Sequence, residues 1–129
     1  MLGLDFNTHK QAHIFRAAQE GIVFSFKYGF DIMLSLGVVP NVIRAGQANM
    51  FLSDVFTQTL VNTTQVPVEM YDTHGGKGAA LGAGVGAKVY SSIKEAMSGL
   101  TILKTIEPVS TEKDKYENAY KLWEQALIL

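Results

Sequence analysis

The sequence lacks cysteine altogether and carries little charge for its size. Without cysteine, its 129 residues offer no disulfide framework, no thiolate nucleophile and no cysteine-based zinc site. A reducing compartment fits this composition, and we expect a cytoplasmic protein. Charged residues make up 18% of the chain, below the usual proportion of about a quarter. So few charges cover a surface poorly, which indicates an oligomer or a piece of something larger.

Neither sign of charge dominates, and long apolar runs are missing as well. The formal net charge of -1 gives no electrostatic reason to propose nucleic acid or an anionic membrane as a partner. No apolar run approaches the roughly 18 residues needed to span a bilayer. The stretch from Met1 to Lys10 shows no charged region followed by an apolar one, so no secretory signal is visible. We therefore expect neither a nucleic-acid nor a membrane partner.

Glycine, in contrast, is concentrated in one segment. Six of the twelve glycines fall between Gly75 and Ala87. Glycine inside a helix costs about 1 kcal/mol relative to alanine, so a helix that keeps several glycines gains close backbone approach. Gly78, Gly82 and Gly86 recur every four residues and leave one helical face without side chains. We expect this face to pack directly against a sheet.

Spacing excludes two nucleotide-binding motifs in this segment. A dinucleotide fingerprint needs Gly-x-Gly-x-x-Gly at a strand-to-helix turn, whereas Gly82–Gly86 reads Gly-x-Gly-x-Gly inside the helix. A Walker A loop fails because Tyr71 replaces its first glycine and Gly78 follows Lys77. Only the pair Gly75-Gly76 precedes the helix in a position to approach a ligand.

Capping signals and periodicity predict an α/β chain. The expected elements are a helix over 8–36, a strand over 42–45 closing on Gly46, a helix capped by Asn49, a strand over 66–71, the glycine-rich helix to Ser91, a short helix over 92–98, a strand or extended connector over 101–106 and a last helix opening at Thr111. This order favours a short, mainly parallel sheet covered by helices. Two or three strands make a thin sheet for so much apolar helix, so the chain looks incomplete.

The first helix is predicted to be long and largely buried. Thr8 and Gln11 read as a capping box at its start, and Gly37 as the stop at its end. The half from Gly21 to Leu36 is apolar nearly all round. We therefore expect this half to be buried on more than one side.

The segment Arg44–Asn49 is the best candidate for a site. It leaves the carboxyl end of a strand and enters a helix, which is where open α/β sheets bind ligands. Gly46 allows a tight turn, Ala48 is small, and Asn49 offers both a donor and an acceptor. A helix cap on a strand-to-helix turn explains the same residues equally well, so spacing leaves both interpretations open.

The titratable residues do not form a recognisable catalytic set. His9 and His13 stand one helical turn apart, but no third metal ligand beyond Asp5 is evident, and Lys10 stands where a zinc protease would carry glutamate. Structural or polar roles for the two histidines are favoured, and no metal site is predicted. The aspartates show no spacing that suggests acid/base partners.

Three ordered motifs resemble the FGGY family of carbohydrate kinases. Gly3-Leu4 followed by His13–Gly21 is similar to the second signature of the family, although Gln19 stands where an apolar residue is usual. Val66-Pro67-Val68 follows in order, and Gly78–Ala83 is similar to the family's glycine-rich helix. The resemblance covers essentially the whole chain. Within the family the chain looks most like the xylulokinases.

The resemblance implies a fold and a nucleotide site. The family has two lobes of the actin-like, ribonuclease-H-like fold, and ATP and sugar meet between them. Residues 1–129 would form the last part of the C-terminal, nucleotide-binding lobe. Gly46 would approach the nucleotide and Asn49 would contact the adenosine, while Gln47 stands where a further glycine is usual and would reshape the pocket. Gly75 and Gly76, expected from their place before the glycine-rich helix to approach a ligand, complete the predicted nucleotide-binding residues.

The resemblance also implies what this stretch lacks. The catalytic aspartate, the phosphate-binding hairpins and the sugar pocket of the family lie upstream, so no catalytic residue is assigned here. ATP, Mg²⁺ and a pentulose would be bound by the intact enzyme, in which the remainder of the kinase chain is the partner. Because phosphoryl transfer needs all these parts, we expect the 129 residues alone to be inactive. The alternative is an interaction module without a catalytic role, which forms a homodimer through its glycine face and apolar helices.

Overall fold

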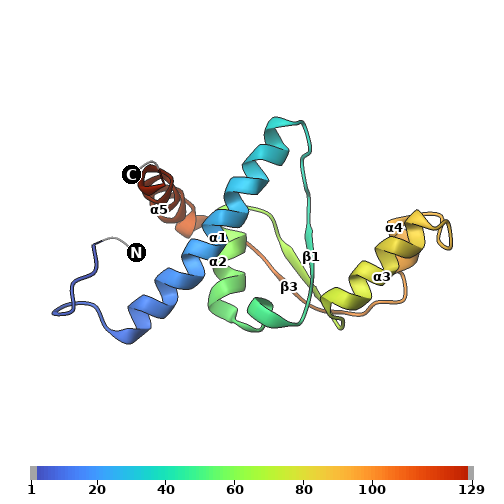
Figure 1. Ribbon diagram of the computed structural model, residues 1–129, viewed down its shortest axis with the longest axis horizontal. Coiled ribbons are helices and arrows are strands. Elements are labelled where there is room, and N and C mark those ends of the chain that lie inside the picture. The colour runs from blue at the N-terminus through green and yellow to red at the C-terminus, as the bar shows by residue number, and fades with distance from the viewer. Residues whose placement is uncertain (1–2, 128–129) are drawn as a thin grey trace.

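The computed structural model describes residues 3–127 and confirms the predicted order of helices and strands (Figure 1). The elements are α1 (Gln11–Ser35), β1 (Ile43–Gly46), the 3-10 helix η1 (Asn49–Leu52), α2 (Asp54–Thr64), β2 (Val68–Tyr71), α3 (Gly75–Gly86), α4 (Ile93–Met97), β3 (Ile102–Ile106), the 3-10 helix η2 (Ser110–Glu112) and α5 (Lys113–Ala126). Among these residues, no helix is both long enough and apolar enough to cross a membrane.

The sheet has the strand order β1-β2-β3. β1 and β2 are parallel, with Ile43 opposite Val68 and Gly46 opposite Tyr71. β3 joins β2 in the antiparallel sense. The chain leaves β2, passes through α3 and α4, and returns at the same end of the sheet, where the Asp72 N–H donates to the Thr101 carbonyl at 3.0 Å. The predicted α/β fold is confirmed, but its parallel part is limited to the β1–β2 pair.

The main core lies between the sheet and helices α1 and α2. Its fully buried side chains come from all three parts: Val23 of α1, Phe56 and Val61 of α2, and Val68 and Met70 of β2. α5 contacts α2 and α1 outside this core and forms a second cluster of Phe24, Tyr116 and Tyr120. α2 is therefore packed by the sheet, by α1 and by α5, which explains why eight of its eleven residues are buried.

The start of α1 differs from the prediction, whereas its end confirms it. The helix begins at Gln11, because the Thr8 hydroxyl donates to the Asp5 carbonyl at 3.4 Å and does not cap the helix. At the other end, Gly37 has a φ of +82°. The N–H groups of Gly37 and Val38 donate to helix carbonyls at 3.0 Å each, which is the hydrogen-bond pattern of a Schellman motif.

The predicted burial of the second half of α1 is wrong within the described residues. Val23 and Phe24 are its buried residues, whereas Phe26 is 55% exposed and Ile32 50% exposed. Of the described helices, α2 and α5 pack against α1, and its C-terminal turns extend past both (Figure 1). An apolar helical surface consequently remains uncovered.

The prediction that the glycine-rich helix packs its bare face against the sheet is also wrong. α3 points away from the core and contacts α4 and β1 (Figure 1). In the described part of the chain, a Cβ added at Gly78, Gly82 or Gly86 would meet nothing within 4 Å, so the bare face does not pack on the sheet. The close approach is at Gly84, where a Cβ would lie 2.9 Å from the Tyr90 ring. The helix ends at Gly86, short of Ser91, because Lys88 adopts a left-handed φ of +61°.

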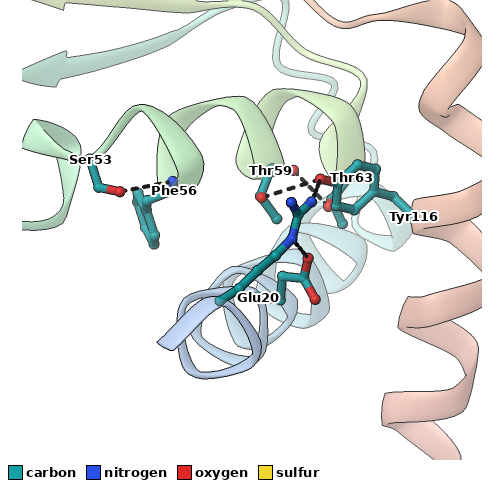
Figure 2. Close-up of polar contacts among 7 residues, drawn as sticks. Glu20, Ser53, Phe56, Thr59, Thr63 and Tyr116 are labelled. Atoms are coloured by element: carbon teal, nitrogen blue, oxygen red, sulfur yellow. Dashed lines mark hydrogen bonds and ion pairs between the residues drawn. The ribbon is translucent and has the colours of Figure 1, made fainter. Parts of the chain in front are cut away.

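Ser53, not Asn49, caps the helix after β1. The Ser53 Oγ accepts the Phe56 N–H at 3.3 Å, as Figure 2 shows, and donates to the Gln19 side chain at 2.7 Å. Replacing Ser53 with alanine is expected to lower the free energy of unfolding by about 1 kcal/mol, because the first-turn N–H loses its acceptor. Urea unfolding measures the change. S53D should retain most of the stability, and S25A, on an exposed position of α1, should change it by less than about 0.5 kcal/mol.

Candidate functional site

The predicted site residues meet where the two parallel strands end. The carboxyl end of β1 leads into Gly46–Asn49, and that of β2 leads through the turn at Asp72–His74 to Gly75 and Gly76, which open α3 and do not precede it as predicted. A cavity of about 420 Å³ lies there, and Gly46, Asn49 and Gly75 line it. Three of the five predicted nucleotide-binding residues are thus brought together from two loops. This is the place in an open α/β sheet where ligands bind.

The cavity is mostly apolar and draws its walls from distant parts of the chain. Besides the three predicted residues, it is lined by Ile22 and Phe26 of α1, Arg44 and Ala45 of β1, Ala48, Met50 and Phe51 of the following loop and η1, and Phe56 of α2. Apolar walls with a few polar groups are typical of small-molecule sites. Nothing in the sequence indicated that α1 would form a wall of this cavity.

Gly46 is required by a close contact between two loops. A Cβ at this position would lie 2.5 Å from the carbonyl oxygen of Thr73 and 3.1 Å from the Cα of His74. The Tyr71 carbonyl holds the two loops together, because it accepts the N–H of Gln47 at 3.1 Å and that of Thr73 at 2.8 Å. The glycine therefore allows the β2–α3 loop to approach β1 closely.

Asn49 occupies a backbone conformation that favours asparagine. Its φ is +53°, in the left-handed region that asparagine tolerates better than most residues. Its side chain is exposed and belongs to the cavity lining. The predicted helix-capping role is wrong, since Ala48 precedes η1 in the cap position and α2 is capped by Ser53. The amide is thus available to donate and accept hydrogen bonds.

Gln47 and Gly76 lie outside the lining of this cavity. Gln47 is exposed, and its backbone N–H is bonded to Tyr71. Gly76 faces the ring of His74, whose atoms would lie 3.2 Å from an added Cβ. Their predicted contribution to nucleotide binding therefore remains a proposal that this geometry does not test.

An ion-pair network holds Arg44, one of the residues that line the cavity, in place. The Arg44 Nε donates to Glu69 Oε2 at 3.1 Å and to the Tyr71 hydroxyl at 3.2 Å, and that hydroxyl donates to the same carboxylate at 2.7 Å. The Tyr71 hydroxyl and Arg44 together hold the pKa of Glu69 below its ordinary value. Cross-strand pairing in the parallel ladder sets this contact, because Arg44 lies opposite Glu69. The register, which the sequence does not show, is what places Arg44 here.

A second polar cluster ties three helices together elsewhere. Arg16 of α1 donates to Glu20 at 2.8 Å and to the Tyr116 hydroxyl of α5 at 3.0 Å. Tyr116 in turn lies 3.4 Å from the Thr59 hydroxyl of α2, and Thr63 donates to the Thr59 carbonyl at 2.7 Å, as Figure 2 shows. None of these residues lines the 420 Å³ cavity. The cluster fixes the packing of α1, α2 and α5.

The possible metal site at the start of α1 is not assembled. Within residues 3–127, no three or more His, Asp or Glu side chains are grouped so that they could hold a metal ion. The Nδ1 atoms of His9 and His13 instead accept backbone N–H groups at 2.9 and 3.0 Å.

Comparison with known proteins relates the chain to sugar kinases. Over 124 residues it is 30% identical to L-xylulose/3-keto-L-gulonate kinase of Escherichia coli K12, an alignment that covers 92% of the chain and 24% of that enzyme. No protein-family model matches the chain.

Solved sugar-kinase structures have a segment with the same fold. The structure of xylulose kinase from Rhodospirillum rubrum superposes with a TM-score of 0.76 at 20% identity, covering 96% of the chain and 25% of that protein. The ligand-bound xylulose kinase from Lactobacillus acidophilus superposes with a TM-score of 0.77 at 22% identity, covering 97% of the chain and 26% of that protein. The gluconate kinase from L. acidophilus superposes with a TM-score of 0.76 at 20% identity, covering 97% of the chain and 25% of that protein.

These comparisons confirm the resemblance to the FGGY carbohydrate kinases, and the chain has the fold of a segment of the solved sugar-kinase structures. It spans about a quarter of the length of the kinases it matches.

Proposed function

We propose that this chain, which is similar over nearly its whole length to FGGY carbohydrate kinases, is the C-terminal part of an ATP-dependent sugar kinase and forms part of its adenosine pocket. The observation that carries the proposal is the cavity where Gly46, Asn49 and Gly75 converge at the carboxyl ends of β1 and β2. The named relatives favour a pentulose as the phosphoryl acceptor.

The chemistry of the cavity fits a nucleoside. Phe26 and Phe51 supply apolar walls for a flat base, and the buried Phe56 packs behind both rings. The exposed Asn49 amide offers a donor and an acceptor to the base or ribose. Gly75 opens the first turn of α3, so its main chain is accessible to the ligand without a side chain in the way.

The parts that perform the chemistry are assigned to the remainder of the kinase. Phosphoryl transfer needs a base for the sugar hydroxyl and Mg²⁺ to neutralise charge on the phosphates. The described residues contain no cluster of metal-ligating side chains. The resemblance to the FGGY kinases puts the base, the Mg²⁺ and the sugar site upstream of this stretch, and the proposal keeps them there.

Nucleotide binding by the chain tests the proposal. Isothermal titration should show weak binding of ATP or ADP, and Asn49→Ala should weaken it by about tenfold because the lost amide makes hydrogen bonds worth roughly 1.4 kcal/mol. Asn118→Ala, on the exposed face of α5, is the matched control and should bind as the parent chain does. With ATP, Mg²⁺ and xylulose the chain should release no ADP above background. Turnover by the chain alone, or binding indifferent to Asn49, would contradict the proposal.

The uncovered surface of α1 favours a second candidate, a self-associating module. Phe26, Tyr28 and Ile32 are each at least 50% exposed on this helix, and apolar patches of this kind mark interaction sites. Light scattering after size exclusion distinguishes the two functions. A tight dimer that ignores nucleotide and the Asn49→Ala change would support the module in place of the kinase segment.

A further inference from the structure

Gln19 of α1 is a polar side chain at a position where the FGGY motif usually has an apolar residue. The structure gives this side chain a defined place. The Ser53 hydroxyl donates to Gln19 Oε1 at 2.7 Å, although the two residues are 34 positions apart in the sequence. Gln19 is half-buried. One end of its amide is thus held by a contact between α1 and the start of α2.

The hydrogen bonds of Ser53 agree with this orientation of the amide. Ser53 Oγ accepts the Phe56 N–H at 3.3 Å, so its single hydroxyl hydrogen is available to donate. The amide oxygen of Gln19 is the acceptor for that hydrogen. Its amide nitrogen, which carries two hydrogens, makes no hydrogen bond with any of the described residues. Gln19 therefore has a fixed oxygen and an unused donor.

Gln19 lines a groove next to the candidate nucleotide cavity. The groove has a volume of about 450 Å³ and lies between α1 and η1. It shares Ile22, Asn49 and Met50 with the 420 Å³ cavity, so the two lie side by side. Its other lining residues are Gln19, Ser53 and the apolar Phe15, Ala18 and Leu52.

Two amides are the polar side chains of this lining that remain available to a ligand. The Ser53 hydroxyl is used in both directions, by Phe56 and by Gln19. The Asn49 amide and the Gln19 nitrogen have no hydrogen-bond partner among residues 3–127. Because Ser53 already holds the Gln19 oxygen, the nitrogen is presented as a donor with little further loss of side-chain freedom. Such a donor suits the ring nitrogens of a purine or the hydroxyl oxygens of a ribose.

We propose that Gln19 is a nucleoside-binding residue, whose Nε2 donates a hydrogen bond to an acceptor atom of the base or ribose. This assignment rests on the proposed function and adds to it a polar contact from α1. The nucleoside lies along the wall that the cavity and the groove share, with Asn49 and Gln19 as its two amide partners. Ser53, which caps α2, positions the Gln19 donor through the Oε1 contact.

Gln19→Glu is the decisive variant, because it removes the donor and keeps the contact with Ser53. A carboxylate oxygen accepts the Ser53 hydroxyl as the amide oxygen does, but it has no hydrogen to donate. By isothermal titration, the affinity for ADP should fall about tenfold, the worth of one hydrogen bond, while the urea midpoint of unfolding stays near that of the parent chain. Gln125→Glu makes the same change of charge at an exposed position of α5. This control should bind ADP as the parent does.

ADP analogues identify the acceptor and cancel the effect of the added charge. The 1-deaza, 3-deaza and 7-deaza analogues each lack one ring nitrogen, and 2′-deoxy-ADP and 3′-deoxy-ADP each lack one hydroxyl. At least one of the five should bind the parent about tenfold more weakly than ADP does, and should bind Q19E as ADP does. The carboxylate repels all these nucleotides alike, so the coupling reports the hydrogen bond alone.

The side-chain amide of Gln19 gives a second measurement. Its nitrogen-15 resonance, assigned by its absence in Q19E, should shift when ADP is added and shift less with the analogue that lacks the acceptor. Additive losses for all five analogues, or an amide resonance that ADP leaves unchanged while Asn49→Ala still weakens binding, would overturn the assignment of Gln19 and leave the proposed function standing. A parent chain that binds no ADP would overturn both.

Discussion

Replacing Gly46 with alanine is expected to destabilise the protein by about 2–3 kcal/mol, as overpacking of a rigid contact does. The new methyl carbon would lie 2.5 Å from the Thr73 oxygen and 2.9 Å from the Thr73 carbonyl carbon. Both are backbone atoms, so no side chain can rotate away. Separation of the two loops would also disturb the Tyr71 carbonyl, which accepts one N–H from each of them. Urea unfolding measures the loss, and ATP binding should weaken because the cavity loses its shape.

Gly82→Ala is the matched control for this change. In the described residues nothing lies within 4 Å of a Cβ at Gly82, and alanine is favoured over glycine inside a helix by about 1 kcal/mol. This variant should be as stable as the parent or more so. If the two substitutions destabilised the chain equally, the close backbone contact would not be the reason that position 46 requires glycine.

Phe56→Ala is expected to produce the largest loss, about 3–5 kcal/mol, because it removes a buried aromatic side chain and leaves a cavity. Phe56 is fully buried between α1, α2 and the sheet. Its ring packs edge-on against those of Phe51 and Phe26, with centroids 5.4 and 6.3 Å apart. Because it also lines the 420 Å³ cavity, the variant should lose nucleotide binding together with stability.

Phe6→Ala is the matched control, because it removes the same type of side chain from an exposed position. Phe6 is 80% exposed, so its removal should change the free energy of unfolding by less than about 0.5 kcal/mol. Thermal or urea unfolding of the two variants in parallel gives the comparison. A Phe56 variant as stable as the Phe6 variant would mean that the core described here does not form.

Local chemistry predicted the elements well where the signal lay within a few residues. The stop at Gly37, the strand that closes on Gly46 and the short helix expected over 92–98 depend on turn conformation or short hydrogen bonds, and the structure has all three, with Ser92 as the cap of α4. Thr8 and Asn49 were wrong as caps for local reasons. The Thr8 hydroxyl donates to the Asp5 carbonyl and is not used as a cap. Asn49 has a left-handed backbone conformation, which a helix-capping residue does not adopt.

The candidate site was only half predictable. Gly46, Asn49 and Gly75 follow strands or begin a helix, so their place at the carboxyl end of the sheet could be read from the order of elements. Phe26 and Arg44 could not be assigned in this way. Phe26 reaches the cavity through the packing of α1 on α2, and Arg44 is positioned by its register opposite Glu69.

The sequence by itself determined the α/β class, the order of the elements, and the resemblance to FGGY kinases, because these depend on periodicity, caps and motif order along the chain. Tertiary structure alone decided which faces are covered. α3 projects from the core with its glycine face open, α1 leaves its second half exposed, and β3 returns antiparallel. Burial and strand pairing depend on contacts between residues far apart in the chain, and the amphipathic pattern of one segment does not specify its neighbour.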